Sequence, residues 1–367
     1  MTNKYLDYIY TNRYRNIDCR EAFMGYVKTQ GKKNKNAIKI VAYAGALGSA
    51  YWRLFAPLME LVKDEMFDAR ITTILYKEDL EWADILWFQR CANLDTILEA
   101  RKAKKDGKVI IYDTDDYLHG LPDYHPNKKF IESSMQLLGM DELCNMSDLI
   151  TMSTPYLKQL YEKKYKTPII VFPNCLRVED WDNLGSHSLD TINIGWGGGV
   201  EHYEDLKLIV PDIKKLLEKE KNYRLVMVNF PGVIYQPKYQ DCLEGIPMNK
   251  RICFYGTMPH QVSNYYHFLD VGLAPLIDND FNRSKSNIKY LEYSMAGIPT
   301  VASDLTPYQG EGIISVTSKG SWGEAIEQAL NLHPITADQR REAVIKKYSI
   351  ENNIKLWKDT FWDLCNG

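Results

Sequence analysis

The sequence lacks any apolar run that approaches the roughly 18 to 20 residues needed to cross a membrane. Its opening segment, MTNKYLDYIYTNRYRN, is polar and charged and lacks the apolar core of a secretory signal peptide. We therefore expect a soluble, cytoplasmic protein with no integral membrane segment.

Cysteine pairs and a large net charge are also missing. The 7 cysteines show neither C-x-x-C nor metal-ligand spacing, which fits reduced thiols and excludes a disulfide framework. The net charge of −3 argues against broad attraction to nucleic acid or to an anionic membrane. A small basic cluster lies between Lys32 and Lys39. It is either a solvated linker or a contact for an acidic partner.

What the sequence does contain is an alternation of buried strands and helices. At 367 residues the chain has enough material for two domains. The alternation predicts an α/β protein with two parallel sheets and about twelve strands. The first clear strand is Ile38–Ala44, and Ile71–Tyr76 is predicted to be another. An aromatic-rich helix with Trp357 and Trp362 closes the chain.

The most informative segment is FNRSKSNIKYLEYSMAGIPTVASDLTPY, residues 281–308. It predicts a short helix with Ser284 or Ser286 as its N-cap, because a serine hydroxyl accepts a hydrogen bond from a free backbone N–H. Gly297 and Pro299 are expected to end this helix, and a buried strand follows.

Basic side chains gather at the start of that helix. Lys289 and Glu292, three residues apart, share one face, and Arg283, Lys285 and Ser286 lie at or before the first turn. A helix N-terminus with serines and lysines is suited to an anion such as a diphosphate. The carboxylate of Glu292 could accept hydrogen bonds from sugar hydroxyls. The alternative is a solvated Lys/Glu surface pair.

The run from Lys289 to Ser303, KYLEYSMAGIPTVAS, resembles the C-terminal signature of GT-B glycosyltransferases, in particular the group 1 (family 4) class. The resemblance implies two doubly wound, Rossmann-like domains that face each other across a cleft. It also implies a nucleotide-diphosphate sugar as donor, with Glu292 on its ribose hydroxyls, and no obligatory metal. The family carries a second glutamate eight positions earlier, where this chain has Ser284.

The resemblance and the strand pattern together predict four parts of the chain. We expect an N-terminal helical and basic extension over residues 1–37 and a Rossmann-like acceptor domain over 38–185. A Rossmann-like nucleotide-sugar domain is expected over 186–348, and a helix over 349–367 that returns to the first domain.

A second donor-binding element is the triple-glycine turn Gly197, Gly198 and Gly199, which follows a predicted strand over 191–196. Glycines let backbone N–H groups approach a phosphate, and the next helix adds its positive end. The alternative is a merely flexible turn. The family supplies an arginine and a lysine here, but this chain has Trp196 and either Glu201 or His202. Positive charge must then come from the segment around Lys285. The resemblance places the nucleotide base against Tyr255, Gly256 and Thr257.

The predicted acceptor side follows the strand Lys108–Tyr112, which runs into DTDDYLHGLPDYHP. Loops at the carboxyl ends of parallel strands carry chemistry in α/β proteins. The acids and histidines there suit proton transfer or orientation of an acceptor hydroxyl, with loop ordering or a metal ion as the alternatives. We predict catalytic roles for Asp115, Asp116 and His119, and an acceptor-side location for Gly45, Gly48, Arg53 and His125.

The resemblance therefore implies a glycosyltransferase (a hexosyl- or pentosyltransferase) that acts with retention on a surface glycan or glycolipid. One alternative is a phage-type enzyme that glycosylates a modified base in DNA. Another is a non-catalytic scaffold that binds a sugar nucleotide or a protein partner.

Overall fold

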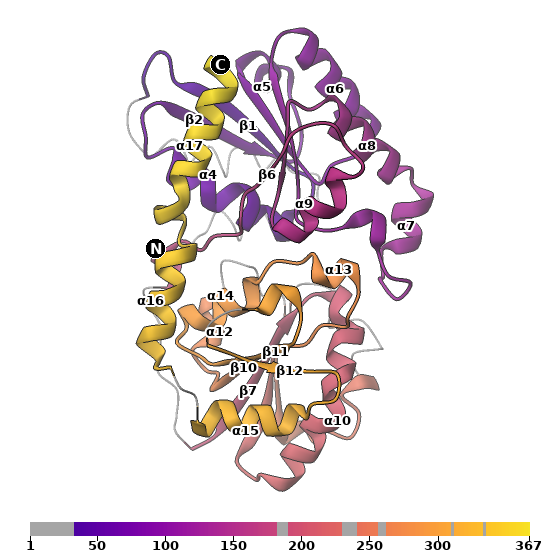
Figure 1. Cartoon of the computed structure of the whole chain (residues 1–367), viewed down its shortest axis with the longest axis vertical. Coiled ribbons are helices and arrows are strands. Elements are labelled where there is room, and N and C mark those ends of the chain that lie inside the picture. The colour runs from indigo at the N-terminus through magenta and orange to yellow at the C-terminus, as the bar shows by residue number, and fades with distance from the viewer. Residues whose placement is uncertain (1–32, 182–189, 230–240, 256–261, 310–311, 333–334) are drawn as a thin grey trace. The chain divides into compact units, whose positions relative to one another are not determined.

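The computed structural model describes residues 33–181, 190–229, 241–255, 262–309, 312–332 and 335–367 (Figure 1). The chain divides into two compact units built from interleaved stretches. The first unit contains the residues up to His119, Lys129–Cys175 and Ile350–Gly367. The second contains Gly120–Lys128 and Leu176–Ser349.

The first unit is built on a parallel six-stranded sheet with the order β2-β1-β3-β4-β5-β6. Its strands are β1 Ile38–Ala44, β2 Phe67–Thr72, β3 Ile85–Gln89, β4 Val109–Thr114, β5 Leu149–Met152 and β6 Ile169–Val171. The strand order reverses between β1 and β3, and ligands of doubly wound proteins bind beyond the carboxyl ends of the strands at such a point.

Helices connect these strands. They are α3 Leu47–Ala50, the π-helical turn η2 Tyr51–Phe55, α4 Ala56–Leu61, α5 Lys77–Trp82, α6 Leu94–Lys105, α7 Lys128–Ser133, α8 Gln136–Met146 and α9 Pro155–Glu162. The last helix, α17 Ile350–Asn366, packs against α4 (Figure 1). It brings Trp357 to 4.6 Å from Phe172 and Phe361 to 5.4 Å from Trp87, measured between ring centroids. All four rings are buried, so α17 completes the core of the first unit.

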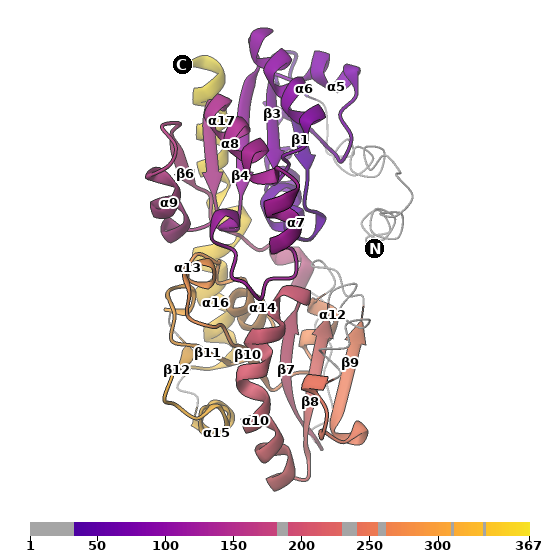
Figure 2. The same ribbon diagram turned by 90° about the vertical axis from the view of Figure 1, so that its right-hand side faces the viewer.

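The second unit has a parallel six-stranded sheet with the order β12-β11-β10-β7-β8-β9 (Figure 2). Its strands are β7 Ile192–Gly198, β8 Tyr223–Asn229, β9 Arg251–Tyr255, β10 Val271–Ala274, β11 Thr300–Ser303 and β12 Ile313–Val316. The helices are α10 Tyr203–Lys219, α12 Ser263–Tyr266, α13 Asp280–Arg283, α14 Ile288–Met295, α15 Trp322–Leu332 and α16 Ala337–Tyr348. The order reverses between β7 and β10, so the glycine turn and the segment after β10 lie at the switch point.

The predicted α/β class with two parallel sheets is confirmed, but three local predictions are wrong. The strand expected over 71–76 is β2, Phe67–Thr72, an edge strand whose alternate residues are polar. The glycine turn begins later than expected, because β7 continues through Gly198. The N-cap of α14 is Asn287, and its side chain makes no capping hydrogen bond. The predicted end of α14 is confirmed, since Gly297 follows the helix with a left-handed φ of 77°.

Within the described ranges, no helix is long and apolar enough to span a bilayer.

Candidate functional site

A buried group of three polar side chains lies beside the carboxyl end of β7. The carboxylate oxygen Oε2 of Glu292 lies 3.0 Å from Nζ of Lys289 and accepts a hydrogen bond from the Tyr266 hydroxyl at 3.3 Å. Lys289 Nζ also donates to the Tyr266 hydroxyl at 3.2 Å. The spacing of Lys289 and Glu292 in the sequence thus produces a direct ion pair, which is buried rather than solvated at the surface.

Burial determines the protonation chemistry of these three groups. The Glu292 side chain is 1% exposed and that of Lys289 12%. Burial raises the pKa of Glu292, and the adjacent Lys289 ammonium opposes that rise. Burial, together with Glu292, raises the pKa of Tyr266 well above its ordinary value, so the phenol stays protonated and acts as a donor.

The backbone of Gly197 packs directly against this group of side chains. A Cβ atom at residue 197 would lie 2.3 Å from the Tyr266 hydroxyl oxygen and 3.5 Å from Lys289 Nζ. Any side chain would therefore displace the hydroxyl that contacts Glu292. The close approach explains why glycine is required at this end of β7.

A second buried carboxylate, Asp205 at the start of α10, orders the glycine turn. Its Oδ2 lies 2.9 Å from Nδ1 of His202. Its Oδ1 accepts hydrogen bonds from the backbone N–H of Ile277 at 2.7 Å and from the Asn282 amide at 3.1 Å. Asp205 and Asn282 were not predicted from the sequence, although an acid in the first turn of a helix was the available signal.

The other predicted donor residues have individual positions in the second unit. Arg283 forms an exposed ion pair with Asp278, and Lys285 Nζ lies 4.4 Å from the centre of the Phe281 ring. Ser284, at the position of the family's glutamate, is buried and donates to the Phe281 carbonyl at 2.7 Å. Three further residues complete this description: Gly199, which is the N-cap of a 3₁₀ turn; Ser286, which is half-buried; and Tyr255, which ends β9. Gly256 and Thr257 lie outside the described residues.

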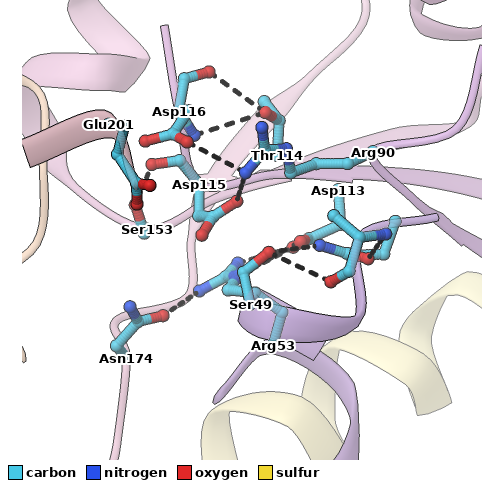
Figure 3. Close-up of polar contacts among 12 residues, drawn as sticks. Ser49, Arg53, Arg90, Asp113, Thr114, Asp115, Asp116, Ser153, Asn174 and Glu201 are labelled. Carbon is cyan, nitrogen blue, oxygen red and sulfur yellow. Dashed lines mark hydrogen bonds and ion pairs between the residues drawn. The ribbon is translucent and has the colours of Figure 1, made fainter. Parts of the chain in front are cut away.

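In the first unit, Arg90 joins two of the predicted catalytic residues (Figure 3). Its Nη1 lies 2.9 Å from Oδ2 of Asp116 and 3.4 Å from Oδ1 of Asp115. Burial raises the pKa of Asp115, Arg90 opposes the rise, and Asp116 adds to it. A carboxylate with a raised pKa is better matched to proton transfer near neutral pH.

Arg90 lies at the switch point and has a left-handed backbone, with φ of 49°. A Cβ atom at Gly45 would lie 2.5 Å from the Gln89 carbonyl oxygen and 2.8 Å from the Arg90 carbonyl. The end of β1 therefore fits closely against the turn that presents Arg90. Sequence reasoning did not identify Arg90, because its neighbours come from a different strand.

Arg53, predicted on the acceptor side, is buried beneath this cluster (Figure 3). It pairs with Asp113, at 3.1 Å from Nε to Oδ1, and donates to Asn174 Oδ1 at 3.1 Å. Thr151 donates to Asp113 Oδ2 at 2.7 Å. This buried network fixes the end of β4, which carries the two catalytic candidates.

The two histidines of the DTDDYLHGLPDYHP segment have separate environments. His119 Nε2 lies 3.1 Å from Asp141 and Nδ1 lies 3.2 Å from the Tyr161 hydroxyl, all within the first unit. Burial, then Lys164, lowers the pKa of His119. His125 belongs to the second unit and contacts the Phe281 ring edge-on. The segment therefore does not form one cluster.

Two further observations concern Gly48 and possible metal ligands. A Cβ atom at Gly48 would meet no atom within 4 Å, so this glycine is not held by close packing. Over the parts of the chain that the structure describes, no group of three or more His, Cys, Asp or Glu side chains is placed to hold a metal ion.

The fold matches solved glycosyltransferase structures. HepE of Anabaena, in complex with UDP and glucose, is 10% identical with a TM-score of 0.64, over 89% of this chain and 100% of that one. Sucrose-phosphate synthase of Thermosynechococcus elongatus is 10% identical with a TM-score of 0.63, over 90% and 99%. The trehalose-6-phosphate synthase OtsA is 13% identical with a TM-score of 0.61, over the same shares. At these identities the likeness shows the GT-B fold.

A sequence family matches part of the chain, within the second unit. Residues 191–331 match the family described as glycosyl transferases group 1. The resemblance found at Lys289–Ser303 is thereby confirmed: the second unit contains a segment of the group 1 glycosyltransferase family, and the chain has the GT-B fold. No curated protein matches its sequence.

Proposed function

We propose that the protein transfers a sugar from a nucleotide-diphosphate sugar to a surface glycan or glycolipid, with retention of configuration at the transferred carbon. The observation that carries this proposal is the buried Tyr266–Lys289–Glu292 group against Gly197, inside the segment that matches group 1 glycosyltransferases. A buried lysine–carboxylate pair loses the hydration of both charges, so it is weak evidence for added stability, and its place at a switch point favours a role in binding.

The second unit binds the donor in this proposal. Backbone N–H groups of Gly197–Gly199 contact the diphosphate, and Arg283, Lys285 and Lys289 supply positive charge. Glu292 accepts hydrogen bonds from the ribose hydroxyls, and Tyr266 holds its carboxylate in place. The nucleotide base contacts the segment that begins at Tyr255.

The first unit supplies the proton acceptor. The bond between the sugar C1 and the diphosphate oxygen breaks, and C1 forms a bond to the acceptor oxygen. The electron pair leaves with the diphosphate, whose developing charge the lysines stabilise. The proton of the acceptor hydroxyl passes to Asp115 or Asp116. His119 is less suited to this step, since each of its ring nitrogens lies close to a polar partner.

A thermal-shift panel tests the donor assignment. UDP, GDP, ADP and TDP, each free and as the glucose ester, are added to the wild type and to Glu292→Gln. One nucleotide is expected to stabilise the wild type selectively, by about 2.7 kcal/mol at a hundred times its Kd. Glu292→Gln is expected to lose this shift.

A matched control is Glu327→Gln, which removes a carboxylate that pairs with Lys219 on the exposed side of α15. Its nucleotide response should equal that of the wild type. If no nucleotide shifts the melting temperature of the folded wild type, the proposal is refuted. If one does, candidate acceptors are tested with it, including lipid-linked oligosaccharides, free glycans and DNA with modified bases.

A further inference from the structure

The segment Gly120–Lys128, called here the 120–128 strap, follows His119 but belongs to the second unit. The Tyr124 hydroxyl accepts a hydrogen bond from the Asn279 amide at 2.9 Å and lies 3.4 Å from the Asn282 amide nitrogen. Next to it, the His125 ring lies edge-on to Phe281, with ring centroids 5.3 Å apart. The strap thus contacts three residues in and next to the short helix α13.

The contacts of Tyr124 continue through buried side chains to the glycine turn. Asn279 is also the N-cap of α13 and accepts from the backbone N–H of Asn282 at 2.9 Å. Asn282 donates to Asp205, and both residues are 1% exposed. Asp205 in turn holds His202, whose Cδ2 would lie 3.4 Å from a Cβ atom at Gly198. Two buried side chains therefore separate the Tyr124 hydroxyl from His202.

The contact of His125 leads to the other half of the donor site. Phe281 is buried, and Lys285 Nζ lies 4.4 Å from the centre of its ring, within range of a cation–π interaction. The position of the Phe281 ring therefore affects one of the cations assigned to the diphosphate. The strap contacts both routes to the predicted phosphate site, through Tyr124 and through His125.

We propose that Tyr124 is a positioning residue for donor binding. Its hydroxyl fixes Asn279 and Asn282, and through Asp205 it holds the glycine turn in the conformation that accepts the diphosphate. This inference rests on the proposed function of the second unit. It assigns a role on the donor side to a segment whose sequence indicated the acceptor side.

The test replaces Tyr124 by phenylalanine, which keeps the ring and removes the hydroxyl. Titration calorimetry measures the Kd of whichever of UDP, GDP, ADP or TDP the wild type binds, and kinetics measures both KM values and kcat. Loss of one hydrogen bond to a buried network is expected to raise the nucleotide Kd and the donor KM about three- to tenfold. The acceptor KM and kcat should stay within about twofold of wild type.

A second variant, Asn279→Ser, keeps a capping oxygen for α13 but removes the amide that donates to Tyr124. It should reproduce the rise in Kd. The double variant should bind no more weakly than Tyr124→Phe, since Tyr124→Phe already removes the contact with Asn279. The control is Tyr223→Phe, the same chemical change at the first residue of β8, which should leave the Kd unchanged.

The outcomes separate this inference from the proposed function. If the wild type binds none of the nucleotides, the proposed function fails. If it binds one and Tyr124→Phe binds it equally well, the inference is overturned while the proposed function stands. A fall in melting temperature without a change in Kd, or a rise confined to the acceptor KM, overturns it as well.

Discussion

Replacement of Gly197 by alanine probes the close contact between this residue and Tyr266 in the proposed donor site. The added Cβ atom would lie 2.3 Å from the Tyr266 hydroxyl oxygen, whereas ordinary contacts begin at 3.4 Å, so the hydroxyl must move by about 1 Å. Its hydrogen bonds to Lys289 and Glu292 are already 3.2 and 3.3 Å long. Such a displacement breaks at least one of them and leaves a buried carboxylate with fewer donors.

The expected cost follows from these two effects. Overpacking and a lost buried hydrogen bond each cost about 1 to 3 kcal/mol, so we expect Gly197→Ala to lower the unfolding free energy by about 2 to 6 kcal/mol. Urea denaturation measures this loss, and calorimetry should show nucleotide binding weakened at least about tenfold. The control is Gly323→Ala in α15, where the nearest atom to a Cβ would be 3.7 Å away. It should be neutral or slightly stabilising.

A rescue experiment identifies the clash itself. Tyr266→Phe removes the hydroxyl that the new methyl group meets, so the double variant should regain part of the stability that Gly197→Ala loses. If Gly197→Ala unfolds at the same urea concentration as the wild type, the contact with Tyr266 does not constrain residue 197. An absence of rescue would place the damage elsewhere in the glycine turn.

Three more predictions concern the first unit. Asp113→Asn leaves the buried Arg53 without its anionic partner, and urea denaturation should show a loss of about 3 to 5 kcal/mol; a loss below about 1 kcal/mol would contradict the pairing. The pKa of His119 is lowered from 6.5, so between its folded and unfolded pKa values the unfolded state binds more protons. The contribution of His119 to stability is therefore complete above about pH 6.5, and it decreases as the pH is lowered below that value. The stability difference between wild type and His119→Gln should shrink from about pH 8 to about pH 5, whereas a constant difference would contradict the assignment. Finally, Arg90 opposes the raised pKa of Asp115, so Arg90→Asn should shift the acidic limb of the kcat/KM profile to higher pH; an unmoved limb would show that Asp115 is not the base.

The strands were predictable because buried parallel strands are nearly continuous apolar runs. Ile38–Ala44 was predicted with the bounds that β1 has. The edge strand β2, FDARIT, alternates apolar and polar residues, and the prediction shifted to a neighbouring apolar stretch. The cap of α14 was missed for a different reason. Ser284 is at the end of α13, a short helix with no hydrophobic period of its own, and donates to a carbonyl there.

The candidate site was predictable only where its contacts are local in the sequence. Lys289 and Glu292 are one helical turn apart, so their contact follows from helix geometry. Arg90 contacts Asp115 and Asp116 across neighbouring strands, and only the register of β3 against β4 brings them together. The different environments of His119 and His125 depend on tertiary contacts that no local pattern encodes.

The path of the chain through the two units has a consequence for the order in which they are made. Every stretch of the second unit precedes residue 350, while the first unit needs Trp357 and Phe361 to cover Trp87 and Phe172. During synthesis, the second unit is complete first. Until α17 is made, Trp87 and Phe172 of the first unit lack the cover of Trp357 and Phe361. A chain that stops directly before residue 350 therefore lacks part of the first unit, although most of that unit is encoded earlier. Such a chain keeps every residue of the second unit and exposes an aromatic surface on the first, which chaperones and proteases recognise.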